Sequence, residues 1–174
     1  MQLRDAAPVY SRAMTADDDS LGIRLSRDVF LSLCAIGWAD GQLDREEADG
    51  ILRAATESGL DIDALQEIEN ATKTSRSLDT LDRSKLKPIE RAFVYATAVW
   101  LARLDGHVDI EERIALKKLG DMLGLPDGIR THASAAAHEV ANLQSGDRPD
   151  RYDFVRLRTR LDERLKDPKN FSDD

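Results

Sequence analysis

A repeat within the sequence is the feature that most constrains how this chain can fold. Residues 29–60 can be placed over residues 94–125 without a gap, so that each position falls on the one 65 residues later. At this offset four groups of residues coincide: Asp40-Gly41 with Asp105-Gly106, Asp44 with Asp109, Glu46-Glu47 with Glu111-Glu112, and Gly59-Leu60 with Gly124-Leu125. Each copy is therefore expected to form a helix, an acidic turn, a second helix and a glycine stop.

The hydrophobic pattern is helical along most of the chain. Apolar residues recur at spacings of three and four, which is the period of an amphipathic helix, over residues 29–36, 48–55 and 89–104. Further helices are expected over residues 62–68, near 110–123 and 127–143, and from Phe154 to Leu165, whereas the polar run 72–84 is predicted to be the main connector. These patterns predict an all-α fold, a single-domain helical bundle of about seven or eight helices in which two helical hairpins are related by a pseudo-twofold axis.

Three regions follow from the position of the repeat. Residues 25–143 hold both copies and are expected to form the duplicated helical domain, and residues 1–24 are expected to be an N-terminal arm or a short helix. Residues 144–174 contain a final Arg-rich helix and a tail. A chain of 174 residues has the size of one domain and can bury a core without disulfides.

The charge of the chain narrows the classes of partner. It has 25 Lys and Arg against 33 Asp and Glu, which gives a net charge of −8 at pH 7. Such a charge repels the phosphates of nucleic acids and anionic membranes. We therefore expect no nucleic-acid partner, and we expect a protein partner, either a second copy or another chain, together with a divalent cation as a further candidate ligand.

Cysteine content and hydropathy indicate the compartment. The single cysteine, Cys34, cannot form an internal disulfide, and one Cys with three scattered His excludes the usual zinc ligand sets. The longest apolar run, Phe93 to Ala102, is too short to cross a bilayer, which takes about 20 residues. We expect a cytoplasmic protein without direct membrane insertion, in which Cys34, on the apolar face of its helix, is buried and inert.

The repeated acidic turn fits the start of a helix. In each copy an Asp stands where the N-cap is expected and a Glu follows three residues later, which is the pattern of a capping box: Asp44 with Glu47, and Asp109 with Glu112. Gly41 and Gly106 supply the positive φ that ends the preceding helix. Capping leaves Asp40 and Asp105 unexplained, because an Asp at the C-terminal end of a helix faces the negative pole of its dipole.

A cation site is the alternative reading of the same turn. The pattern Asp-Gly-x-(Leu/Val)-Asp-x-x-Glu is the second half of an EF-hand loop. The first half is missing, because Ile36 and Trp38 stand where copy one needs its first acidic ligands, so a tight EF-hand is excluded. A weaker site for a cation of the Ca²⁺ or Mg²⁺ class remains, alongside capping, with six candidate ligands: Asp40, Asp44, Glu47, Asp105, Asp109 and Glu112.

Two segments, each followed by an amphipathic helix that ends in Gly-Leu, also carry a family resemblance: Trp38-Ala39-Asp40-Gly41-Gln42-Leu43-Asp44-Arg45-Glu46-Glu47 and Leu104-Asp105-Gly106-His107-Val108-Asp109-Ile110-Glu111-Glu112. They resemble the TerB-like domain of bacterial tellurite-resistance proteins over about residues 25–143, although copy two has Leu104 in place of the Ala. The resemblance implies an all-helical, non-enzymatic domain with an acidic surface, whose acidic turns bind metal, in a stress-response or metal-resistance context.

These observations predict a non-enzymatic acidic binding or adaptor module with a divalent cation at its turns. One alternative is a metal-independent interaction scaffold for a basic partner, and a second is a metal-assisted hydrolase with an open cleft joining both turns. Enzyme chemistry is weakly supported, because the three His lack metal-ligand spacings and no Gly-rich phosphate loop is present.

The last helix carries a row of arginines at spacings of four: Arg156, Arg160 and Arg164. Nearby acidic residues dilute this row, and the whole chain is acidic. Such a row is expected to be a solvated face, or to pair with acidic residues of the same protein or of a second copy.

Overall fold

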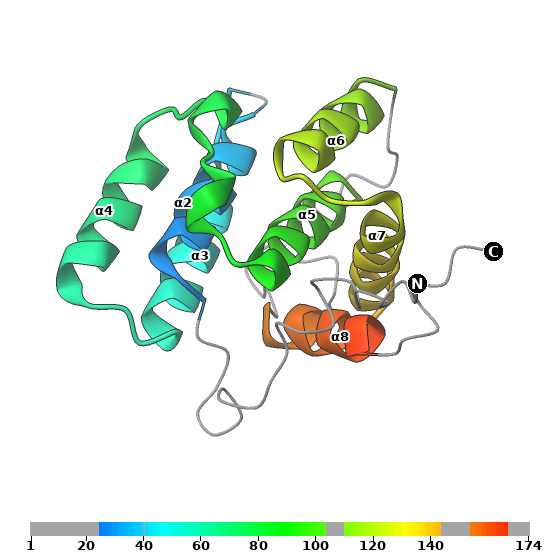
Figure 1. The fold of residues 1–174 in the computed structure, drawn as a ribbon. Helices are drawn as coiled ribbons and strands as arrows, with labels where there is room; N and C mark the ends of the chain where they lie inside the picture. The colour runs from blue at the N-terminus through cyan, green and yellow to red at the C-terminus, as the bar shows by residue number, and fades with distance from the viewer. Residues whose placement is uncertain (1–24, 40, 104–109, 144–153, 167–174) are drawn as a thin grey trace, which may run out of the picture.

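The computed structural model of the chain describes residues 25–39, 41–103, 110–143 and 154–166. Over these residues it contains seven α-helices and two short 3-10 helices, and no strand (Figure 1). The elements are α2 (Arg27–Gly37), α3 (Arg45–Glu57), α4 (Ile62–Lys73), η1 (Leu78–Thr80), η2 (Arg83–Lys85), α5 (Pro88–Arg103), α6 (Ile110–Met122), α7 (Asp127–Ala141) and α8 (Phe154–Lys166). The predicted all-α fold is confirmed. Among these helices none is both long and apolar enough to cross a membrane.

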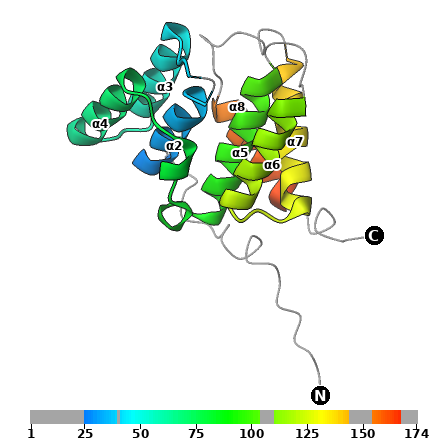
Figure 2. The same cartoon turned by 90° about the horizontal axis from the view of Figure 1, so that it is seen from above.

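Helix α5 lies at the centre of the molecule, between two groups of helices. Figures 1 and 2 show α2, α3 and α4 on one side of α5 and α7 on the other, and in Figure 1 α8 lies below α5 and α7. Helix α2 packs on α3 and α4, and α7 packs on α5 and α8. Because α2 also packs against α5, the two groups share the central helix, and α6 lies along α5 as well.

The core is built around α5, in which every residue from Ala92 to Trp100 is buried. Small side chains such as Ala96 let neighbouring helices approach closely, and large ones such as Phe93 and Trp100 fill the space between them. The ring of Phe154 in α8 has its centroid 6.0 Å from that of Phe93 and 6.2 Å from that of Trp100, which are distances typical of aromatic pairs. Helix α8 therefore shares one core with α5 and α7.

Two helices follow the sequence repeat in their bounds. Helix α3 (Arg45–Glu57) and helix α6 (Ile110–Met122) begin and end 65 residues apart. Gly59 follows the first helix with φ 71°, and Gly124 follows the second with φ 65°. Both glycines thus end their helices in the left-handed conformation that the sequence predicted. The pseudo-twofold axis relating the two hairpins stays a prediction.

The connector between α4 and α5 begins later than predicted. Its first residue was expected at Thr72, and the preceding helix over residues 62–68, but α4 runs to Lys73. Thr72 is buried, and its Oγ1 donates a hydrogen bond to the carbonyl oxygen of Glu69 at 2.7 Å. The helix continues because the polar side chain is satisfied by the preceding turn. The remaining connector contains η1 and η2, which begin at the capping side chains of Ser77 and Asp82.

Candidate functional site

The first acidic turn forms the capping box at the start of α3. The N–H of Glu47 donates to Oδ1 of Asp44 at 2.8 Å, and the N–H of Asp44 donates to Oε2 of Glu47 at 3.4 Å. Gly41 has a φ of 92°, in the left-handed region that favours glycine. The capping interpretation is therefore confirmed for the first copy, and the two carboxylates satisfy backbone donors that the helix leaves open.

Leu43 fixes this turn against the core. A Cβ atom on Gly37 would lie 2.4 Å from Cδ1 of Leu43, so the missing side chain at Gly37 lets Leu43 pack against the end of α2. Leu43, Glu47 and Phe154 line a narrow gap next to Gly37. Glu47 is consequently half-buried, whereas Asp44 is exposed.

The structure describes three of the six predicted cation ligands: Asp44, Glu47 and Glu112. Asp44 and Glu47 lie together at the start of α3, and Glu112 lies in the first turn of α6. The other three lie outside the described residues: Asp40, Asp105 and Asp109. In the part of the chain that is described, no three His, Cys, Asp or Glu side chains form a group that could hold a metal ion. The divalent-cation site, and the cleft between both turns that a hydrolase needs, therefore stay predictions.

Helices α3 and α4 form an acidic layer, defined as residues 45–73. This segment contains three basic and eight acidic residues. Its inner side packs into the core through four residues: Ile51, Ala55, Ile68 and Ala71. Of its acids, Asp49 pairs with Arg45 and Glu69 with Lys73, in exposed i,i+4 pairs. The exposed Glu46, Glu57 and Asp63 have no ion pair to a described residue, so the outer side of the layer is strongly negative.

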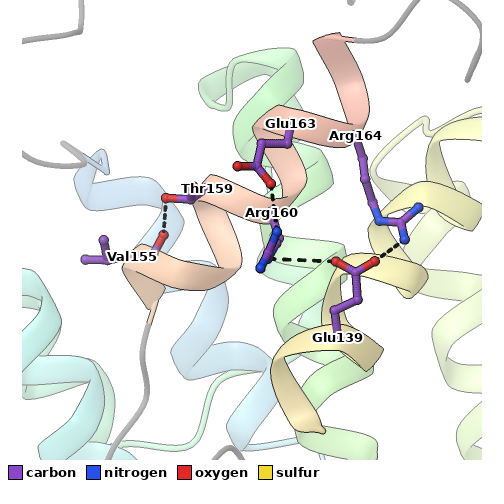
Figure 3. Close-up of polar contacts among 6 residues, drawn as sticks. All are labelled: Glu139, Val155, Thr159, Arg160, Glu163 and Arg164. Atoms are coloured by element: carbon purple, nitrogen blue, oxygen red, sulfur yellow. Dashed lines mark hydrogen bonds and ion pairs between the residues drawn. The ribbon is translucent and has the colours of Figure 1, made fainter. Parts of the chain in front are cut away.

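Helix α8 has the opposite charge and packs on α7 and α5 (Figure 1). It contains five basic and two acidic residues. Arg160 and Arg164 both reach Glu139 of α7, and Arg160 also pairs with Glu163 at 3.1 Å (Figure 3). The prediction that the arginine row pairs with acidic residues of the same protein is confirmed for Arg160 and Arg164. The sequence gives no local signal that Glu139 is the partner of these arginines.

Cys34 offers no reactive thiol. It lies in α2 and is fully buried. Burial raises the pKa of its thiol to about 12, and the positive charge of Arg76 offsets this only in part. Because the thiolate is the reactive form of cysteine, Cys34 is inert at neutral pH, as its place on the apolar face predicted.

A polar groove that sequence analysis missed lies between α2, α4 and the two 3-10 helices. It holds about 490 Å³ of space open to solvent, and its charged lining comes from separate parts of the chain, among them Arg27, Glu67, Arg76 and Lys85. The only signal in the sequence is the high density of basic residues in the connector. That signal does not reveal which part of α2 lies opposite.

Comparison with known proteins identifies no relative of this chain. No family model, no curated protein and no solved structure matches the chain. The resemblance to TerB-like domains therefore rests on the segments 38–47 and 104–112 alone. The function has to be argued from charge and geometry.

Proposed function

We propose that this protein is a non-enzymatic binding module of the TerB-like kind, whose acidic layer captures a basic segment of a partner protein. The observation that carries the proposal is the exposed negative charge of residues 45–73, of which eight are acidic and three are basic. The resemblance of the turns supports a bacterial stress or metal-resistance setting. A single, buried cysteine supports a location in the reducing cytoplasm.

Charge of one sign on one side of a protein attracts an oppositely charged partner before contact is made. Glu46 lies in the first turn of α3 and Asp63 in the first turn of α4, and both are exposed. The positive helix α8 packs mainly on α5 and α7. A basic segment is therefore attracted to α3 and α4 more strongly than to the rest of the described surface. Helix α8 of a second copy has the required charge as well.

The proposal is tested by titrating the protein with a fluorescent lysine-rich peptide and measuring anisotropy in the presence of a chelator. We expect binding at low salt that weakens as salt is added, because exposed charges are screened. Asp63→Asn should weaken binding about two- to fivefold, since a single exposed charge pair contributes about 0.2–1 kcal/mol.

Asp127→Asn is the matched control, because Asp127 is also an exposed acid in a first helical turn but lies in α7. The proposal fails if the peptide does not bind in chelator, or if the two variants weaken binding equally. Sedimentation of the protein alone distinguishes a second copy from another chain as the partner.

Binding of a divalent cation at the first acidic turn is the second candidate function. The observation in its favour is the convergence of the Asp44 and Glu47 carboxylates at the start of α3. Capping uses Oδ1 of Asp44 and leaves Oδ2 without a hydrogen bond to the described residues. Such an oxygen is the kind of ligand that Ca²⁺ and Mg²⁺ prefer.

Asp44→Asn separates the two roles, because Asn is as good an N-cap as Asp but a poorer cation ligand. Calorimetric titration with Ca²⁺, Mg²⁺, Mn²⁺ and Zn²⁺ should show heat for the natural protein and not for the variant. Free metal at 100 times its dissociation constant should raise the free energy of unfolding by about 2.7 kcal/mol. If neither heat nor a chelator-sensitive melting shift is seen, the turn is a cap alone.

A further inference from the structure

The polar groove beside α2 is open to solvent and is lined by charged and apolar side chains from α2, α4 and the connector. One wall is α2 from Arg27 to Ala35, and the facing wall is the connector from Arg76 to Lys85. The apolar side chains of Leu31 and Leu81 also line it, from α2 and from the connector.

The acidic side chains of the groove already have partners. Nη1 of Arg27 pairs with Oε2 of Glu67 at 3.2 Å, and Nη2 of Arg27 lies 3.5 Å from Oδ1 of Asp28. Asp82 accepts hydrogen bonds from the side chain and the backbone N–H of Ser84, at 2.6 and 3.0 Å. These hydrogen bonds, and secondarily the charge of Lys85, hold the pKa of Asp82 below its usual value. The carboxylates of Asp28, Glu67 and Asp82 therefore already interact with other groups of the protein.

Two cationic side chains of the groove form no ion pair of this kind within the described residues. Arg76 is half-buried and Lys85 is exposed, and neither forms an ion pair with a carboxylate in the described ranges. A partly desolvated guanidinium without a counter-charge is unfavourable unless an anion joins it. Its planar fork of donors matches the two oxygens of a carboxylate or phosphate.

The surroundings favour an anion as well. The segment 73–91 contains six basic and three acidic residues, in a chain with a net charge of −8.

We propose that this groove binds a small ligand through an oxyanion, a carboxylate or a phosphate, which Arg76 and Lys85 hold. Arg76 donates through its guanidinium fork, Lys85 adds a second positive charge, and Leu31 and Leu81 contact the carbon part of the ligand. This site goes beyond the acidic layer, because its recognition depends on cations that do not belong to α3 and α4.

The test uses the full chain labelled with ¹⁵N and two probes, inorganic phosphate and acetate, each titrated against chloride at constant ionic strength. Amide shifts are followed by NMR. We expect saturable shifts confined to the residues of the groove, on α2 and on the connector. Saturation by phosphate alone identifies a phosphate-bearing ligand, and saturation by acetate identifies a carboxylate-bearing one.

Arg76→Gln should raise the apparent Kd about tenfold or more, which corresponds to the loss of a charge-assisted hydrogen bond of a half-buried group. Lys85→Gln should raise it about two- to fivefold, because Lys85 is exposed. Arg45→Gln is the control, because Arg45 carries the same charge on α3 and is 94% exposed. The proposal is overturned if neither anion saturates, or if all three variants have the Kd of the natural protein. Should Arg76→Gln unfold, as its spectrum would reveal, Lys85→Gln decides the outcome alone.

Discussion

One buried carboxylate, that of Glu90, joins the starts of two helices. Its Oε2 accepts from the N–H of Lys87 at 2.8 Å, just before α5, and its Oε1 accepts from the N–H of Ser26 at 3.2 Å, just before α2. Only 4% of Glu90 is exposed, so these bonds form out of contact with bulk water. They satisfy backbone donors that a helix start leaves open, and they hold α2 against the first turn of α5.

We predict that Glu90→Ala lowers the free energy of unfolding by about 1–3 kcal/mol, because two backbone donors in part-buried hydrogen bonds lose their acceptor. Glu90→Gln keeps one acceptor oxygen and should cost less than Glu90→Ala. Urea unfolding monitored by circular dichroism measures both. The control is Glu57→Gln, an exposed position in α3, which should change stability by less than about 0.5 kcal/mol. Equal stability of Glu90→Ala and the natural protein would contradict this role.

His138 gives the fold a dependence on pH. Its pKa lies below the ordinary 6.5, first because the imidazole is partly buried and second because of the positive charge of Arg103. A lowered pKa means that the folded state favours the neutral form. The corresponding stability is therefore complete above pH 6.5, the value for the unfolded chain, and is lost as the pH falls through the lower folded pKa.

We expect His138→Asn to lose less stability than the natural protein when the pH is lowered from about 7 to about 5.5, the range in which an ordinary His titrates. Arg103→Gln should reduce the loss in part, because it removes one of the two causes. Thermal melts across this range measure the difference. If the melting temperatures of the natural protein and of His138→Asn fell equally as the pH is lowered, His138 would not be the source of the pH dependence.

At the scale of elements, the end of α6 depends on an arginine of α7. Nε of Arg130 donates to the carbonyl oxygen of Leu125 at 2.7 Å, and its Nη2 pairs with Asp121 at 2.7 Å. A Cβ atom on Gly120 would lie 2.7 Å from Cζ of Arg130. Gly120 thus makes room for the guanidinium, and the guanidinium contacts the negative end of α6, where a cation is favourable.

We predict opposite effects for two helical glycines. Gly120→Ala should destabilise the protein by about 1–2 kcal/mol, because displacing Arg130 breaks its hydrogen bonds. Gly128→Ala should be neutral or stabilise by up to about 1 kcal/mol, since nothing lies within 4 Å of its added Cβ and Ala favours a helix. Denaturant unfolding of both variants checks the sign. Stabilisation by Gly120→Ala would show that Arg130 shifts at no cost.

The helices themselves could be predicted because each has a periodic apolar face and a local stop signal. Gly59 and Gly124, for example, end α3 and α6 with positive φ. The predicted end of α4 was wrong because residues 69–73 are mostly polar in sequence, although Thr72 is buried in the fold.

At the scale of the whole molecule, Phe154 is the residue through which α8 enters the common core. It lies against Phe93 and Trp100 of α5, and it is 5% exposed. Its neighbour Val155 is 56% exposed. These two apolar residues, adjacent in sequence, therefore differ in what they contribute to folding.

We predict that Phe154→Ala lowers the free energy of unfolding by about 3–5 kcal/mol, through lost burial and the cavity left beside α5. Val155→Ala, the matched control, should change it by less than about 0.5 kcal/mol. Denaturant unfolding of each variant measures both values. If Phe154→Ala were as stable as Val155→Ala, α8 would not be part of the cooperative core.

The candidate sites were harder to predict than the helices. The capping box at Asp44 and Glu47 is local, and its pattern is visible within four residues. The groove depends on residues 27–35 meeting the connector 76–85, and that contact is set by tertiary packing rather than by any local pattern. The pairing of Glu139 with Arg164 likewise requires the packing of α7 on α8.

The hydrogen bond from Ser26 to Glu90 spans 64 positions of the chain, and this separation bears on how the protein is synthesised. A ribosome synthesises α2, α3 and α4 before it adds Glu90. During that interval the start of α2 lacks its acceptor, because contacts distant in sequence form only after the intervening chain has been made and its ends brought together. We therefore expect α2, α3 and α4 to remain incompletely folded until α5 has been synthesised. The C-terminal half of the protein then completes the folding of the N-terminal half.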